Sequence, residues 1–132
     1  MKQINTTCII DDDEIYIFAV KRLIQKGDFC DNILIFKNGK DAIKELKNLI
    51  LNDVNIPELI LLDINMPIMD GWQFLEEFIK IKPKKEIVIY VVSSSINPTD
   101  MERAKSYKNV SNYIVKPISR DALFEIKKTF AA

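Results

Sequence analysis

The sequence predicts an α/β domain in which five parallel strands alternate with five helices, a doubly wound (βα)5 arrangement. Five short apolar runs are each followed by a stretch with helical spacing of apolar residues. Several runs are almost continuous Ile, Leu and Val, which is typical of parallel strands covered on both faces. Right-handed crossovers between such strands would place helices on both sides of the sheet.

The predicted strands are the apolar runs themselves, each bounded by polar residues or by turn formers. In chain order they are Thr6–Ile10, Ile33–Phe36, Glu58–Leu62, Glu86–Val92 and Asn112–Val115.

Apolar residues three, four, seven or eight positions apart predict amphipathic helices between the strands. The fourth helix has the weakest pattern, since Pro98 suits a helix start and 100–107 supplies only a short helix. The apolar stripes of the other four helices are Ile15, Phe18, Ala19 and Leu23; Ala42, Leu46, Leu49 and Ile50; Leu75, Phe78 and Ile79; and Leu123, Ile126 and Phe130.

The length of 132 residues suits one domain, and we expect 1–132 to form it with no output domain after it. Nineteen basic and nineteen acidic residues balance, which argues against a general nucleic-acid binder. The start MKQINTTCII is not a signal peptide and the apolar runs are too short to cross a bilayer, so we expect a cytoplasmic protein without membrane contact.

The absence of histidine excludes His-containing metal cages, Ser-His-Asp and Cys-His nucleophile pairs, and a histidine phosphoryl carrier. Cys8 and Cys30 stand apart without a CxxC motif, so we expect neutral thiols, although the sequence leaves a bridge between them open.

Polar residues that can carry chemistry follow four of the predicted strands. Asp11, Asp12, Asp13 and Glu14 follow the first, and Asp63 follows the third within LILLDINMPIMDG. Ser93-Ser94-Ser95 follows the fourth, and Lys116-Pro117 follows the fifth. Ligand sites of open α/β sheets lie at this edge, so the sequence predicts one site there.

An oxygen-rich cluster without nitrogen or sulfur ligands favours Mg2+, which would also relieve repulsion between the carboxylates. A lysine and a hydroxyl beside it could hold phosphoryl oxygens, and a carboxylate can itself accept a phosphoryl group. Each group also has an ordinary structural interpretation: a helix cap for the acidic run, a strand end for Asp63, a loop for the serines and a solvated lysine for Lys116.

These motifs together resemble the response-regulator receiver domain of two-component signalling, over about 6–130. The resemblance rests on IIDDDE, NGKDAI, LLDINMPIMDG, VVSSS and YIVKP. It implies a flavodoxin-like sheet in the order 2-1-3-4-5, as in stand-alone, chemotaxis-type receivers.

The resemblance also implies a role for each matching residue. Asp63 would be the phosphoacceptor. Asp12 would bind Mg2+ directly, Asp11 would act largely through water, and Asn65 would offer its backbone carbonyl. The other matching positions are Ser93, which would bind a phosphoryl oxygen, Lys116, which would pair with the acceptor through a turn whose Lys-Pro bond is usually cis, and Tyr113, the aromatic switch.

Some residues in these motifs have simpler interpretations. If the resemblance is set aside, we interpret Tyr113 as a half-buried strand residue. The position of Asp13 suits the role of a helix cap better than that of a metal ligand. We interpret Gly71 as a permissive turn residue in a loop and Trp72 as a packing residue. Ser95 stands at a position that influences hydrolysis in the family, so the phosphoryl lifetime stays open.

The predicted function is that of a switch, with a sensor histidine kinase or histidine phosphotransfer protein as donor and an unknown protein as target. One alternative is a Mg2+-dependent phosphatase with an aspartyl nucleophile. Such enzymes usually carry a second acid two positions after the nucleophile, where this chain has Asn65. The other alternative is a constitutive interaction module, although the acceptor, metal and lysine positions are all filled.

Overall fold

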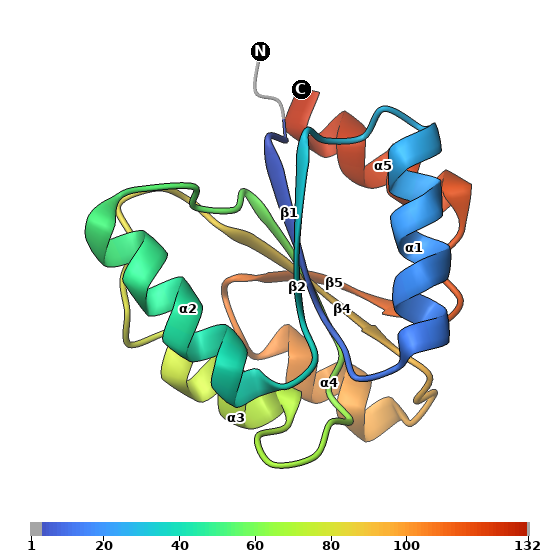
Figure 1. Cartoon of the computed structure of the whole chain (residues 1–132). Coiled ribbons are helices and arrows are strands. Elements are labelled where there is room, and N and C mark those ends of the chain that lie inside the picture. The colour runs from blue at the N-terminus through green and yellow to red at the C-terminus, as the bar shows by residue number, and fades with distance from the viewer. Residues whose placement is uncertain (1–3, 132) are drawn as a thin grey trace.

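A computed structural model describes residues 4–131, in which strands and helices alternate throughout (Figure 1). The strands are β1 (Thr6–Ile10), β2 (Asn32–Phe36), β3 (Leu59–Leu62), β4 (Val88–Ser93) and β5 (Val110–Val115). The helices are α1 (Glu14–Lys26), α2 (Gly39–Asn52), α3 (Gly71–Phe78), α4 (Pro98–Lys105) and α5 (Arg120–Ala131).

The five strands form one parallel sheet in the order β2-β1-β3-β4-β5, which confirms the predicted class and strand order. In Figure 1, α1 and α5 lie on one face of the sheet, and α2, α3 and α4 lie on the other. The carboxyl ends of the strands therefore meet at the edge from which α1 begins.

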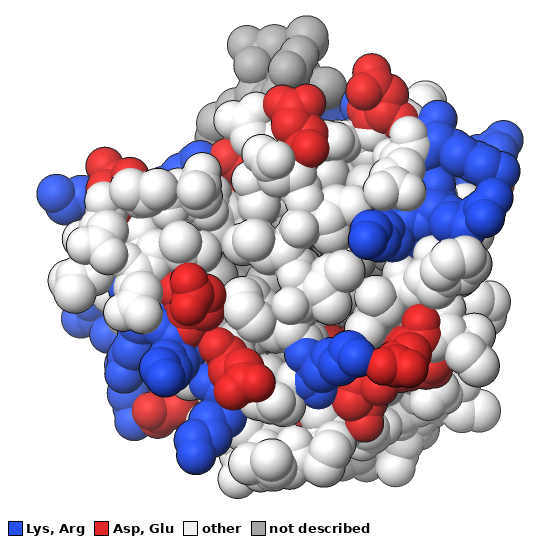
Figure 2. All heavy atoms as spheres, in the orientation of Figure 1, with Lys and Arg blue, Asp and Glu red and all other residues white. Residues whose placement is uncertain are grey.

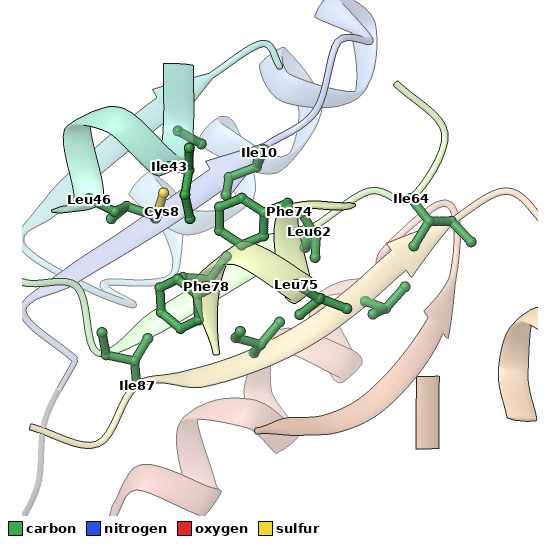
Figure 3. Close-up of a cluster of buried hydrophobic side chains, with 14 of the residues drawn as sticks. Cys8, Ile10, Ile43, Leu46, Leu62, Ile64, Phe74, Leu75, Phe78 and Ile87 are labelled. Carbon is green, nitrogen blue, oxygen red and sulfur yellow. The ribbon is translucent and has the colours of Figure 1, made fainter. Parts of the chain in front are cut away.

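Alternation along the strands divides the core into two layers. Cys8 and Ile10 pack toward α2 and α3, whereas Ile9 between them packs toward α1 and α5. Figure 3 shows the first layer, where Phe74 and Phe78 of α3 lie over the sheet with ring centroids 5.4 Å apart. Because both faces are covered, the central strands are buried along their whole length, which explains their uninterrupted apolar sequence.

The predicted first strand coincides with β1, whereas the boundaries of the other four predicted strands differ from the observed ones by one or two residues. Glu58, predicted as the first residue of the third strand, precedes β3. Its carboxylate accepts hydrogen bonds from the backbone N–H groups of Asn5 (3.0 Å) and Thr6 (2.8 Å) and pairs with Lys85. A nearly buried carboxylate is thus retained at the start of the sheet because backbone donors and one lysine satisfy it.

The apolar stripe predicted for α1 is not the face that packs on the sheet. Ile15 and Phe18 are 82% and 61% exposed. The buried residues of α1 are Tyr16, Ile17, Val20 and Ile24. Since this helix is apolar on nearly all sides near its start, its spacing contains two stripes, and only packing against the sheet selects one. The stripes predicted on α2 and α5 do face the core.

No helix within residues 4–131 combines the length and the apolar character required to cross a membrane. Cys8 is buried and Cys30 half-buried, and both are free thiols. Burial raises the pKa of both thiols, which keeps them neutral as expected.

Candidate functional site

Backbone hydrogen bonds continue the sheet one residue beyond the strands and set the predicted site residues side by side. The N–H of Asp63 donates to the carbonyl of Ile10 at 2.9 Å, which aligns the residue after β3 with the end of β1. The N–H of Lys116 donates to the carbonyl of Ser93 at 2.9 Å, which aligns the residue after β5 with the end of β4. Sheet register, rather than loop conformation, therefore positions these groups.

Three carboxylates converge at this edge. Oxygen atoms of Asp11, Asp12 and Asp63 all lie within 4.8 Å of one another. Asp11 and Asp63 are 1% and 5% exposed, whereas Asp12 faces solvent. Asp13, next in the run, caps α1 instead, since its Oδ1 accepts from the N–H groups of Ile15 (3.0 Å) and Tyr16 (3.2 Å). The prediction that Asp13 is a helix cap is confirmed.

The ammonium group of Lys116 lies against the two buried carboxylates. Its Nζ is 2.8 Å from Oδ2 of Asp11 and 3.8 Å from Oδ2 of Asp63. The same atom lies 4.3 Å from the centroid of the Tyr16 ring, a distance suited to a cation–π contact. The peptide bond between Lys116 and Pro117 is cis, as the resemblance implied.

The contact with Tyr16 is the site feature that the sequence analysis missed. Tyr16 lies in the first turn of α1, after the cap residue Asp13, and no spacing in the sequence pointed to its contact with Lys116. Its hydroxyl is buried without a hydrogen-bond partner in the structure, and burial together with the charge of Asp11 raises its pKa. Tyr16 therefore stays neutral, and its ring packs against the ammonium group of Lys116.

The close approach of the carboxylates and their burial raise the pKa values of Asp63 and Asp11. Burial, reinforced by the negative charge of Asp11, raises the pKa of Asp63 to about 6, although Lys116 and the backbone N–H of Asn65 oppose the shift. Burial also raises the pKa of Asp11, with the hydrogen-bonding and charge of Lys116 acting in the opposite direction. One lysine thus neutralises this pair of acids incompletely, and the site favours additional positive charge.

The donor set fits a hard divalent cation. All three side chains offer carboxylate oxygens, and a single ammonium group faces the two buried ones. Carboxylate oxygens without nitrogen or sulfur ligands suit Mg2+, whose charge would offset the remaining repulsion. Asn65, predicted to offer its carbonyl, lies two residues after Asp63 at the same edge.

The hydroxyl side of the site is linked to Tyr113 through Ser95. Ser93 is fully buried, and its Oγ accepts a hydrogen bond from the N–H of Ser95 at 3.2 Å. The carbonyl of Ser95 accepts a 2.8 Å hydrogen bond from the hydroxyl of Tyr113. The Ser95 hydroxyl donates to Asp100 of α4 at 2.6 Å. Ser95 therefore forms hydrogen bonds with Ser93, with Tyr113 and with Asp100 of α4.

The interpretation of Gly71 as a turn residue is wrong. Asp70 and Gln73 form a reciprocal capping box, and Gly71 is the first residue of α3. A Cβ atom at Gly71 would lie 2.5 Å from the carbonyl oxygen of Asp63 and 2.6 Å from the Cα of Ile64. Glycine is required because the start of α3 packs against the backbone of Asp63 and Ile64, not because the chain needs a positive φ.

Trp72 is a packing residue, as predicted. It is 8% exposed and stacks on Tyr107 with ring centroids 6.2 Å apart. The guanidinium group of Arg103 lies 4.6 Å from the centroid of the Trp72 ring. These contacts join α3 to the α4 region.

The chain belongs to the response regulator receiver domain family, whose model matches residues 7–128. It is 25% identical over 115 residues to the probable methanogenesis regulatory protein FilR2 of Methanothrix harundinacea, covering 87% of this chain and 74% of that protein. It is 35% identical over 91 residues to the sensor histidine kinase CheAY of Helicobacter pylori, covering 69% of this chain and 11% of that kinase. A two-component response regulator from Cytophaga hutchinsonii has a similar structure, with a TM-score of 0.88, 28% identity and 98% of both chains covered.

Members of this family are signalling switches of two-component systems that interact with histidine kinases or phosphotransfer proteins and bind Mg2+ at an acidic pocket. The lengths of the relatives differ greatly, since the chain spans about three quarters of FilR2 but about a tenth of CheAY. The family therefore occurs in proteins of quite different overall length.

Proposed function

We propose that this protein is a phosphoacceptor in a two-component phosphorelay and that Asp63 receives the phosphoryl group from a phosphohistidine of a partner protein. The observation that carries the proposal is the environment of Asp63: a buried carboxylate, two further carboxylates within 4.8 Å and Lys116 at 3.8 Å. The partner would be a sensor histidine kinase or a histidine phosphotransfer protein, in the cytoplasm.

In the proposed step, a carboxylate oxygen of Asp63 attacks phosphorus, the P–N bond to the partner's imidazole breaks, and an aspartyl phosphate forms. The electron pair of the P–N bond stays on the imidazole nitrogen, and the imidazole leaves as the neutral base with a proton taken up from solvent. With a pKa of about 6, Asp63 is largely ionised at neutral pH yet more basic than a solvated carboxylate, which suits a nucleophile. The adjacent Lys116 and the hydroxyl of Ser93 are positioned at neighbouring strand ends to bind the equatorial oxygens.

Asp11, Asp12 and Asp63, with the backbone carbonyl of Asn65, would hold Mg2+ in this proposal. When bound, the cation supplies charge neutralisation to the phosphoryl oxygens in the transition state. Asp11 has a second task, because its ion pair holds Lys116 at the site before phosphorylation.

The phosphorylated form would recruit Ser93 and Lys116 as donors to the new oxygens. A shift of Ser93 pulls on the N–H of Ser95, whose carbonyl holds the Tyr113 hydroxyl. Tyr113 and Ser93 would thus act as the switch that changes a surface near α4 and β5 for an unidentified target protein.

Incubation with acetyl phosphate and Mg2+, followed by mass spectrometry, tests the proposal. We expect one phosphoryl group on the wild type, mapped to Asp63, and none on Asp63→Asn. Phosphate on Ser93, Ser94 or Ser95 would overturn the aspartyl mechanism. Continuous release of phosphate with turnover of a phosphomonoester would favour a phosphatase, and no reaction would favour a constitutive interaction module.

A further inference from the structure

A hollow of about 380 Å³ lies between α1 and α5, outside the phosphoacceptor site. Its floor is apolar. Phe29 and Leu123 are 5% and 4% exposed and belong to the core, and Leu23 of α1 is half-buried beside them. Phe124 of α5 lines the same hollow but is 59% exposed. A large aromatic ring at the edge of an apolar hollow is a suitable contact for one bulky side chain.

The charged groups that line this hollow are all basic. Lys26 comes from the last turn of α1, whereas Arg120 and Lys127 come from α5. The Nζ of Lys127 donates a 2.9 Å hydrogen bond to the carbonyl of Asp28, which holds this cation against the end of α1. No carboxylate side chain is among the described residues that line the hollow.

Two larger hollows among the described residues differ in this respect. One, of about 690 Å³ near the ends of α2 and α3, is lined by Asp53 and Glu77 together with several lysines. The other, of about 490 Å³ near the end of α3, is lined by Glu86 together with lysines. In both, the two signs of charge neutralise each other in part. Uniform positive charge therefore distinguishes the α1–α5 hollow.

The whole of this helix pair is basic although the chain has no net charge. Six basic residues lie on α1 and α5 against three acidic ones. The six are Lys21, Arg22, Lys26, Arg120, Lys127 and Lys128. Figure 2 shows basic side chains gathered at the upper right, over the C-terminal half of α1 as labelled in Figure 1. Lys128 also lies 5.5 Å from the centroid of the Phe124 ring, although its ammonium group is paired with Glu125 at 3.7 Å.

We propose that the α1–α5 hollow binds an acidic segment of a partner protein through one aromatic side chain of that segment and its flanking carboxylates. The aromatic side chain would lie on Phe124 and the apolar floor, and the carboxylates would pair with Lys26, Arg120 and Lys127. A hollow of this size accommodates a single large side chain, and the uniform charge selects acidic over basic segments. The interaction does not require phosphorylation of Asp63.

The probe is a short fluorescent peptide in which glutamates flank one phenylalanine, titrated with the full chain and followed by fluorescence polarisation and amide NMR shifts. We expect the largest shifts at Gly27, Leu123 and Phe124. Arg120→Gln and Lys127→Gln should each weaken binding about threefold or more, and Phe124→Ser should do so with the charge unchanged. Lys44→Gln and Leu51→Ser are matched controls on α2, and both should bind like the wild type.

Equal weakening by Lys44→Gln would overturn the proposal, because binding would then follow net charge alone. Shifts that map outside the hollow, or equal affinity for a peptide with alanine in place of phenylalanine, would also contradict it. If a single-stranded oligonucleotide binds these residues and the peptide does not, the ligand of the hollow is a nucleic acid and the proposal of an acidic protein segment is wrong. Circular dichroism of each variant verifies that a loss of binding is not a loss of fold.

Discussion

Lys116 lies nearer to Asp11 than to Asp63, with Nζ 2.8 Å from Oδ2 of Asp11. The lysine therefore has Asp11 as its main ion-pair partner. Its separation of 3.8 Å from Oδ2 of Asp63 leaves the Asp63 carboxylate incompletely neutralised, which agrees with the raised pKa of that carboxyl.

Asp63→Asn should stabilise the metal-free protein at neutral pH. The raised pKa means that the folded state retains a proton that the unfolded state has lost, so wild-type stability falls as pH rises from about 4 to about 6. The penalty then levels off at about 2–3 kcal/mol, and the variant lacks it. Urea unfolding of both proteins across this pH range measures the difference. A constant difference at every pH would contradict the proposed ionisation of Asp63.

Asp12→Asn should weaken Mg2+ binding about tenfold, because an exposed carboxylate directed at the cluster is lost while the buried acids stay. Asp13→Ser is the matched control. It removes the adjacent charge but retains a side chain that can cap α1. Isothermal titration calorimetry measures both. If Asp13→Ser weakens binding as much as Asp12→Asn, the effect is one of net charge and Asp12 is not a ligand.

Lys116→Met should destabilise the metal-free protein by about 3 kcal/mol at neutral pH, since it leaves two buried carboxylates without their cation. The deficit should decrease in acid, where Asp11 and Asp63 are protonated. Lys37→Met, at an exposed ion pair with Glu14, should change stability far less, because solvent screens this pair. Thermal unfolding with and without Mg2+ separates the two variants, and equal losses would refute the structural role of Lys116.

Tyr113→Phe should leave phosphorylation by acetyl phosphate unchanged within about twofold while it lowers stability by about 1 kcal/mol through loss of the bond to Ser95. Tyr107→Phe is the matched control, because its hydroxyl bonds to Glu76 outside this loop. Phosphorylation rates from intact-protein mass spectrometry test the division of roles. A folded Tyr113→Phe protein that no longer accepts phosphate would place this hydroxyl in the chemistry.

Gly71→Ala should destabilise the fold by about 2–3 kcal/mol, because the new Cβ would meet backbone atoms of Asp63 and Ile64 that cannot move independently. Gly27→Ala should cost less than about 1 kcal/mol, since its Cβ would lie 3.2 Å from one carbonyl oxygen at the open end of α1. The denaturant midpoints of the two variants measure the difference, provided that the slopes of their unfolding transitions are equal. If both variants lose the same free energy of unfolding, the backbone at the start of α3 can move to accommodate a Cβ atom, contrary to this expectation.

Local signals in the sequence were sufficient for the strand–helix order and for the residues at the strand ends. Uninterrupted apolar runs identify buried parallel strands, and the carboxyl ends of such strands share one edge. The residues Asp11, Asp63, Ser93 and Lys116 could therefore be assigned to one site before any distance was known. The role of Asp13 as a cap followed from its position before an apolar helix.

The groups that meet at the site could be identified from the sequence because they directly follow apolar runs, and the carboxyl ends of parallel strands share one edge. Which stripe of α1 is buried was decided by packing against the sheet, since that helix is apolar on nearly every side near its start. The same is true of the Tyr16 contact with Lys116 and of the close approach behind Gly71. These features depend on distances between segments far apart in the chain, which arise from packing and leave no periodic pattern in the sequence.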